Sequence, residues 1–114
     1  MLGPYAQAVA VGDLVFCAGQ VGLDPASGRL VPGGVEAETA RVLENLAAVL
    51  AAAALGLGDI VKTTVYLVDL GEFAVMNAVY GRYFSPPYPA RATVGVAALP
   101  AGARVEIEAV AVRR

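Results

Sequence analysis

The spacing of hydrophobic positions changes along the chain, and these changes predict its strands and helices. Valine-rich runs on both sides of Gly12-Asp13 are typical of two strands joined by a tight turn. Two later segments repeat their apolar residues at helical spacing, and strand-like runs follow them. The predicted strands cover residues 5–11, 14–21, 60–68, 92–98 and 104–112, and the predicted helices cover residues 35–55 and 72–84.

Glycine and proline mark the predicted ends of these elements. Gly56 and Gly58 should end the first helix, and Pro86-Pro87 should stop the second. The segment 22–34 is dense in glycine and proline, which predicts a long loop with one short strand near Leu30.

The resulting order, ββαβαββ, predicts a single α+β domain over residues 1–114, with both helices packed on one face of one sheet. The other face of that sheet then needs a cover. Along residues 92–98, Thr93 is the one polar side chain, and neither side of the strand is charged. Leaving such a face in water would expose a larger apolar patch than a monomer ordinarily carries, so we expect a homo-oligomer.

Composition narrows the functional classes. The chain has 114 residues, of which 58% are hydrophobic and 16% charged, as in compact globular proteins. Its 8 basic and 10 acidic residues give a net charge of −2, which offers no basic stripe for binding nucleic acid. The longest uncharged apolar run, residues 46–58, is too short to cross a bilayer, and no secretory signal precedes it. We therefore expect a cytoplasmic protein without a membrane or nucleic-acid partner.

The absence of histidine removes whole classes of chemistry. Without histidine and with one cysteine, the chain has no zinc-site pattern, no histidine base and no internal disulfide. Cys17 lies among hydrophobic residues in a predicted strand, where a thiol behaves as a small apolar group. Phosphate-binding loops and nucleophile elbows are also missing. Carboxylates, arginines, tyrosines and backbone groups remain as candidates.

Arg91 is the first of these candidates. It follows Pro89-Ala90 and precedes an uncharged run, so its guanidinium lies at the start of an apolar strand. The guanidinium is planar and has a fork of parallel N–H groups, which in such a place suits bidentate binding of a carboxylate. The alternative is a structural arginine paired with a glutamate of the same chain.

Glu106 and Glu108 form the second candidate group. They alternate with apolar residues, so both carboxylates leave the same face of the last strand. Two like charges this close either have cationic partners or raise the pKa of one member, which suits proton transfer. We expect Glu108 to pair with Lys62, which leaves Glu106 as the functional candidate.

Tyr5 and Asn77 carry weaker signals. Tyr5 follows Gly3-Pro4, a rigid turn that can present its hydroxyl to a cleft, but tyrosine also packs half-buried in many proteins. Asn77 lies in the second predicted helix, where a surface position is the simpler interpretation.

These pieces, in this order, resemble the reactive intermediate/imine deaminase family, also called the Rid or YjgF family. The resemblance covers nearly the whole chain, and the Pro-Ala-Arg and Glu-Ile-Glu segments at this separation are its most specific part. The segments that carry it are Gly3-Pro-Tyr-Ala-Gln7, Ala18-Gly-Gln20, residues 58–65, Asn77, Pro89-Ala-Arg91 and residues 105–113.

The resemblance implies a chorismate-mutase-like subunit in a homotrimer, with sites at the subunit interfaces. It implies hydrolysis of small 2-imino acids, formed from enamines such as 2-aminoacrylate, to 2-oxo acids and ammonia, without a metal or an organic cofactor. By position, Arg91 resembles the carboxylate-binding arginine and Glu106 the acid that positions water. Tyr5 and Asn77 resemble pocket residues, and Gly19 resembles the residue that contributes backbone groups.

The chain departs from the family pattern at Ala18, where many deaminating members have serine, and at Thr93, where cysteine is frequent. Met1 also stands almost directly before the Gly-Pro-Tyr segment, so a short N-terminal strand is missing from the pattern. Ala18 favours an alternative function, a non-catalytic small-carboxylate-binding or regulatory protein of the same fold. A third possibility, an RNA-cleaving translation inhibitor, is disfavoured by the net charge and the lack of histidine.

Overall fold

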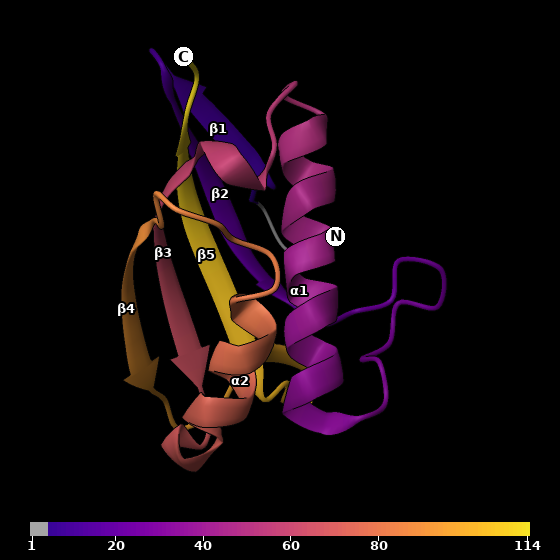
Figure 1. The fold of residues 1–114 in the computed structure, drawn as a ribbon. Helices are drawn as coiled ribbons and strands as arrows, with labels where there is room; N and C mark the ends of the chain where they lie inside the picture. The colour runs from indigo at the N-terminus through magenta and orange to yellow at the C-terminus, as the bar shows by residue number, and fades with distance from the viewer. Residues whose placement is uncertain (1–4) are drawn as a thin grey trace.

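A computed structural model describes residues 5–114 as one five-stranded mixed sheet with two helices in front of it (Figure 1). The strands are β1 (Ala8–Val11), β2 (Leu14–Val21), β3 (Ile60–Leu67), β4 (Ala90–Gly95) and β5 (Val105–Val112), and the helices are α1 (Gly34–Ala51) and α2 (Phe73–Tyr80). Short 3₁₀ turns, η1 (Leu57–Asp59), η2 (Leu70–Glu72) and η3 (Pro100–Gly102), join some of them. The predicted α+β class and the ββαβαββ order are confirmed.

The sheet has the strand order β1-β2-β5-β3-β4. Only the β3–β4 pair is parallel among the strand pairs of the described residues. The β1–β2 hairpin turns at Gly12-Asp13, as predicted, with Val11 opposite Leu14. In the loop before α1, one isolated bridge between Leu23 and Leu30 takes the place of the predicted short strand.

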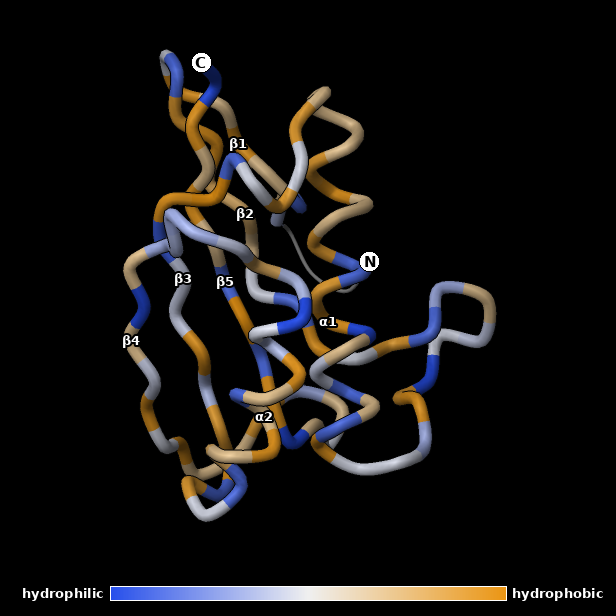
Figure 2. Tube along the Cα trace, in the orientation of Figure 1, coloured by the Kyte–Doolittle hydropathy of each residue, from blue (hydrophilic) through white to orange (hydrophobic). Residues whose placement is uncertain are grey.

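The core lies between the two helices and one face of the sheet. Along β5, residues at odd positions are buried and those at even positions are more exposed. In the first half of the strand this burial pattern coincides with the alternation of orange and blue in Figure 2. The buried strand residues pack against the apolar side of α1, whose Leu46 and Leu50 are inaccessible to solvent. Burial of this face by helix packing is the main hydrophobic contribution to the fold.

Both ends of α1 depend on left-handed backbone. Gly33 precedes the helix with φ 116°, and a Cβ there would lie 2.8 Å from that of Ala37, so glycine is required. At the other end the helix stops at Ala51, well before the predicted Gly56. Ala54 takes the left-handed position (φ 60°), and Leu55 N–H donates to the Leu50 carbonyl at 2.9 Å in a Schellman-type cap. The sequence-based prediction placed this end too late, because the left-handed residue after a helix is usually glycine and the first glycine here is Gly56.

Three other predicted elements have different limits, and the first of them is β1, which begins at Ala8 instead of residue 5. Helix α2 ends at Tyr80, because Gly81 begins a series of tight turns that replaces the predicted last helical turn. Strand β4 begins at Ala90 and ends at Gly95, earlier than the predicted 92–98, because its partner β3 ends at Leu67, opposite Gly95. Arg91 therefore lies inside a paired strand.

The face of the sheet away from the helices is open in the single chain. Cross-strand partners place Val9 beside Phe16 and Val11 beside Leu14, and all four side chains are exposed, Phe16 to 45%. Val94 of β4 lies on the same open face and is 40% exposed. The sequence predicted an uncovered apolar face, and the structure has one. None of the helices among residues 5–114 is both long and apolar enough to cross a membrane.

Candidate active site

Arg91 extends from β4 toward the helix side of the sheet and reaches α2. Its register partner on β3 is Thr63, which is buried beneath α2, and partners across a parallel pair lie on the same face. The Arg91 guanidinium donates from Nη1 to Asn77 Oδ1 at 2.7 Å. The structure thus brings together two of the residues that the sequence singled out.

A cavity of about 420 Å³ opens beside this pair, and it is large enough for a small organic acid. The cavity is formed by the end of α2, the following turn and the start of β4. Its lining residues are Asn77, Tyr80, Gly81, Tyr88, Pro89 and Arg91.

The alternative of a structural arginine paired with a glutamate is wrong for the described chain. Within residues 5–114, Arg91 forms no ion pair, whereas Arg104 pairs with Glu72 and Arg41 with Glu44. The hydrogen bond to Asn77 engages only one edge of the guanidinium. The rest of its N–H groups remain available for an anion.

Glu106 lies on the opposite, open face of the sheet, because its neighbours Val105 and Ile107 are buried under the helices. Its carboxylate lies over Gly19 of β2, where an added Cβ would be 2.5 Å from Oε2. A bulge makes this possible: β2 takes three steps from Cys17 to Gln20 while β5 takes two. Because Gly19 has no side chain, the Glu106 carboxylate can lie directly against the β2 backbone.

The expected ion pair between Glu108 and Lys62 is absent from the described residues. Lys62 Nζ donates instead to Thr64 Oγ1 at 2.9 Å, and Glu108 Oε1 accepts from the Tyr66 hydroxyl at 2.8 Å. Glu108 therefore has no cationic partner within residues 5–114 and lies on the same face as Glu106.

The surroundings of Glu106 favour its protonated form. Partial burial against β2 raises the pKa of the Glu106 carboxyl, and the nearby charge of Glu108 raises it further. A carboxyl group with a pKa closer to neutrality exchanges a proton more readily at the pH of the cell. The direction of this pKa shift is the one that suits a group that both accepts and donates a proton.

The two halves of the candidate site do not meet within one chain. Arg91 lies opposite Thr63 on one side of β3, and Glu106 lies opposite Tyr66 on the other side. With a strand spacing of about 5 Å and a rise of about 3.3 Å per residue, their Cα atoms are about 14 Å apart. Their side chains also leave opposite faces, so one small molecule cannot contact both in the same protomer.

The other residues that the sequence singled out lie near Arg91, near Glu106 or in neither place. Thr93, two positions after Arg91, lies on the helix face of β4, and Ala18 lies in the bulge next to Gly19. Tyr5 precedes β1, is about half exposed and is not part of the cavity beside Arg91. Cys17 lies in the core as expected, and burial raises the pKa of its thiol, which makes it unreactive.

Sequence reasoning missed the aromatic residues beneath Arg91. The guanidinium carbon lies 4.7 Å from the ring centroid of Tyr80 and 5.4 Å from that of Phe73. Both residues recur at helical spacing in the second predicted helix, and that spacing alone does not mark a site. Their spacing from Asn77, four residues on one side and three on the other, placed all three on one helix face and could have revealed the cluster.

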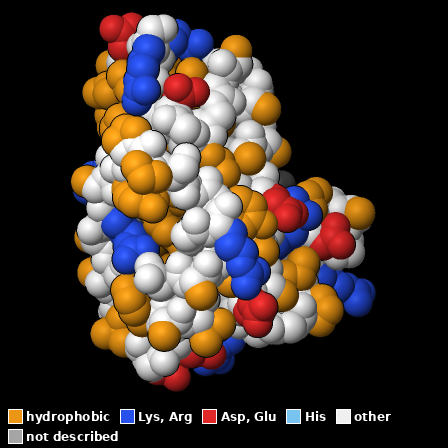
Figure 3. Space-filling view, viewed as in Figure 1, with side chains coloured by type: hydrophobic (Ala, Val, Ile, Leu, Met, Phe, Trp, Pro, Cys, Tyr) orange, Lys and Arg blue, Asp and Glu red, His pale blue; other side chains and the backbone are white. Residues whose placement is uncertain are grey.

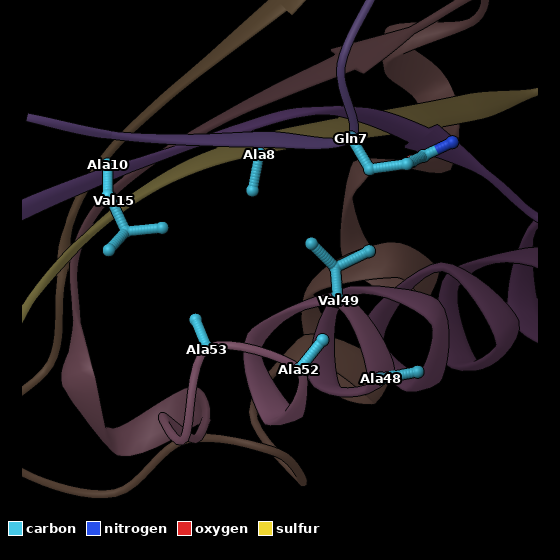
Figure 4. Close-up of a pocket in the computed structure, with 8 residues that line it drawn as sticks. All are labelled: Gln7, Ala8, Ala10, Val15, Ala48, Val49, Ala52 and Ala53. Atoms are coloured by element: carbon cyan, nitrogen blue, oxygen red, sulfur yellow. The ribbon is translucent and has the colours of Figure 1, made fainter.

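A more voluminous cavity lies elsewhere, between β1 and α1 (Figure 4). It measures about 570 Å³, and alanine and valine side chains point into it from both elements. Gln7 is its one polar side chain, and the Gln7 Oε1 already accepts a hydrogen bond from Gln20 at 2.7 Å. This cavity has no charged side chain to bind an anion, whereas the cavity beside α2 has Arg91.

Comparison with known proteins places the chain among proteins of related sequence and fold. A family model described as Endoribonuclease L-PSP matches residues 1–113. The 2-iminobutanoate/2-iminopropanoate deaminase of Mus musculus is 53% identical over 112 residues, which cover 98% of this chain and 83% of the mouse protein.

Solved structures agree with this relationship. RidA from an Antarctic Psychrobacter superposes with a TM-score of 0.94 at 47% identity, covering 98% of this chain and 90% of its own. TdcF of E. coli, solved with bound serine, gives a TM-score of 0.93 at 43% identity, covering 100% of this chain and 91% of its own.

The first prediction concerns the origin of the raised Glu106 pKa. Glu108→Gln removes the charge of the neighbouring carboxylate, which is the second cause of the raised pKa after burial. The pKa of Glu106 should therefore fall. A carboxyl-carbon NMR titration of parent and variant measures the change. Glu36→Gln in the exposed first turn of α1 is the control and should leave the Glu106 pKa unchanged. An equal Glu106 pKa in the Glu108→Gln protein would contradict the assignment.

The second prediction concerns stability against pH. Because the Glu106 pKa is raised in the folded state, the folded chain holds this proton more tightly than the unfolded chain. Its contribution to the free energy of unfolding therefore falls as pH rises from the unfolded pKa through the folded one. Glu106→Gln should be more stable than the parent above this window and equal to it below. Thermal unfolding across acidic to neutral pH checks this, and a constant difference at all pH values would argue against it.

Proposed function

The chain belongs to the Rid (YjgF) family, whose family model is described as Endoribonuclease L-PSP, and from this we propose that it hydrolyses small 2-imino acids to 2-oxo acids and ammonia. The family resemblance of the sequence is thereby confirmed. The observation that carries the proposal is the position of the Arg91 guanidinium. It lines a cavity, it forms no ion pair with a carboxylate within residues 5–114, and it retains N–H groups that can bind a substrate carboxylate.

We propose that the site is completed between copies of the chain in a homotrimer of the chorismate-mutase-like type. Two observations support this. The open sheet face carries exposed apolar side chains that need a cover, and Arg91 and Glu106 lie on opposite faces of the same sheet. A neighbouring copy that packs its open face near β4 would bring its Glu106, Gly19 and Tyr5 toward Arg91 and Asn77 of the first copy.

The proposed reaction uses one water molecule. Arg91 binds the substrate carboxylate through two N–H groups and so orients the imine carbon, which lowers the entropic barrier to attack. Glu106 from the neighbouring copy holds the water and accepts its proton while the new C–O bond forms. The same carboxyl group then donates that proton to the nitrogen, which gives a carbinolamine with one hydroxyl and one amino group. Glu106 next takes the hydroxyl proton and passes it to the amino group while the C=O bond forms and the C–N bond breaks, so that ammonia leaves the 2-oxo acid.

Ala18 marks the main alternative. The backbone beside Glu106 lacks the hydroxyl that serine would supply, so a protein that binds small carboxylates without turnover remains a defined competitor. An assay separates the two: a threonine dehydratase reaction supplies the imine, and release of 2-oxo acid and ammonia is followed with and without this protein. Acceleration supports the deaminase; binding of 2-oxobutanoate without acceleration supports the alternative.

RNA cleavage, to which the family model's description refers, is not supported by the charge distribution. The chain has a net charge of −2 and no histidine. On the face drawn in Figure 3, basic side chains are scattered and several lie beside acidic ones. Binding to RNA requires clustered positive charge to neutralise phosphates. We therefore propose a cytoplasmic enzyme without a nucleic-acid partner, and RNA incubated with the pure protein should stay intact.

The third prediction tests the assembly. The parent should sediment as a trimer at micromolar concentration, and Val94→Asp on the open face should dissociate or unfold it, because a charge there cannot be buried in an apolar interface. Val75→Asp, at an exposed position on α2, is the control and should remain trimeric. A folded parent monomer, or a Val94→Asp protein that stays trimeric, would contradict the proposed interface.

The fourth prediction separates binding from chemistry. Arg91→Lys keeps the charge but loses the fork, so turnover should collapse and the affinity for 2-oxobutanoate should fall. Glu106→Gln preserves shape and should lower kcat by a factor on the order of 10² with little effect on that affinity. Each variant must first be shown to be folded and trimeric. Parent-like turnover by Arg91→Lys would remove the basis of the proposed mechanism.

A further inference from the structure

Three residues of α2 form a seat for the Arg91 guanidinium. Phe73, Asn77 and Tyr80 lie on one face of the helix, and the guanidinium reaches this face from β4. Its carbon is 4.7 Å from the Tyr80 ring centroid and 5.4 Å from the Phe73 ring centroid, and Nη1 donates to Asn77 at 2.7 Å. Both aromatic contacts are within the range of cation–π attraction.

The Tyr80 ring is held in place by a hydrogen bond to the sheet. Its hydroxyl forms a 2.7 Å hydrogen bond with the hydroxyl of Thr63, which is inaccessible to solvent. Thr63 is the residue of β3 directly opposite Arg91 in the β3–β4 register. Thr63 therefore holds the Tyr80 ring through its hydroxyl, and Arg91 lies beside Thr63 on the neighbouring strand.

We propose that the rings of Tyr80 and Phe73 form a positioning seat that orients the Arg91 fork before a carboxylate arrives. An arginine side chain has several rotatable bonds, and fixing them on binding weakens affinity. Contact with two rings restricts the motion of the guanidinium in advance, while Asn77 accepts a hydrogen bond from Nη1. The remaining N–H groups then face the cavity as a preformed fork.

This inference rests on the proposed function only for the identity of the ligand as a 2-imino or 2-oxo acid. Its competitor is that Tyr80 and Phe73 are ordinary packing residues. The two explanations differ in what the ring and the hydroxyl of Tyr80 each do. A seat requires the ring for carboxylate affinity, whereas the hydroxyl bond to Thr63 contributes mainly to stability.

The experiment measures the Kd of 2-oxobutanoate by calorimetry, together with the Tm of each variant in its assembled form. Tyr80→Leu removes the nearer ring and should weaken binding on the order of tenfold. Tyr80→Phe keeps the ring and loses the hydroxyl, so it should lower Tm but keep the Kd within about twofold of the parent.

Phe84→Leu is the matched control. Phe84 is buried and packs on Tyr80 with ring centroids 4.5 Å apart, but it is not one of the rings beneath Arg91. This variant should lose stability as Tyr80→Leu does and keep the parent Kd. Phe73→Leu changes a partly exposed residue, so it continues the test if Tyr80→Leu does not fold; it should weaken binding about threefold.

Parent-like affinity in folded Tyr80→Leu, or in Phe73→Leu if the former does not fold, would overturn the seat. Equal weakening by Phe84→Leu would also overturn it, because general loss of packing would then explain the result. Arg91→Lys distinguishes this failure from failure of the proposed function. If Arg91→Lys weakens binding and the ring variants do not, only the seat is wrong; if Arg91→Lys binds like the parent, the carboxylate site and its seat are both wrong.

Discussion

The chain forms one sheet but has helices on only one of its faces, and this constraint organises the molecule. The helix side is covered by α1 and α2, and the residues of the central strands β3 and β5 that point toward it are inaccessible to solvent or nearly so. On the other side, Phe16, Leu14 and Val94 remain partly exposed. Apolar burial is the dominant favourable term in folding and association, so the second face provides a driving force for self-assembly that one chain cannot use alone.

Alternation along the strands then decides where each polar group can act. A shift of one residue along β5 would bury Glu106 under α1 and place Ile107 on the open face. On β4 the same rule directs Arg91 toward α2, where rings and an amide can hold a guanidinium. The two charged groups therefore occupy different environments: Arg91 an aromatic seat, and Glu106 a glycine bulge beside a second carboxylate.

Sequence reasoning recovered what depends on local patterns. The element order, the hairpin at Gly12-Asp13 and the open apolar face follow from spacing, turn residues and the lack of charge. It failed where long-range pairing, an unusual backbone conformation or the choice of side-chain partner decides. The limits of β4 are set by the end of β3, and α1 ends in a left-handed alanine, which local propensity does not predict. The partner of Lys62 is Thr64, two residues along its own strand, and the partners of Arg91 come from a helix whose register on the sheet no spacing rule gives.

The separation of Arg91 from Glu106 makes catalysis a property of the proposed assembly. Each copy would give its Arg91 half to one neighbour and its Glu106 half to the other, a head-to-tail relation that closes into a ring after three copies. In such a ring the number of complete sites equals the number of chains, and none exists in a free monomer. Association would then regulate turnover by mass action, because dilution removes active sites without altering any residue in them. The open face would serve stability and chemistry together, since in the proposed assembly the contact that buries its apolar side chains would also bring Glu106 to the carboxylate bound at Arg91.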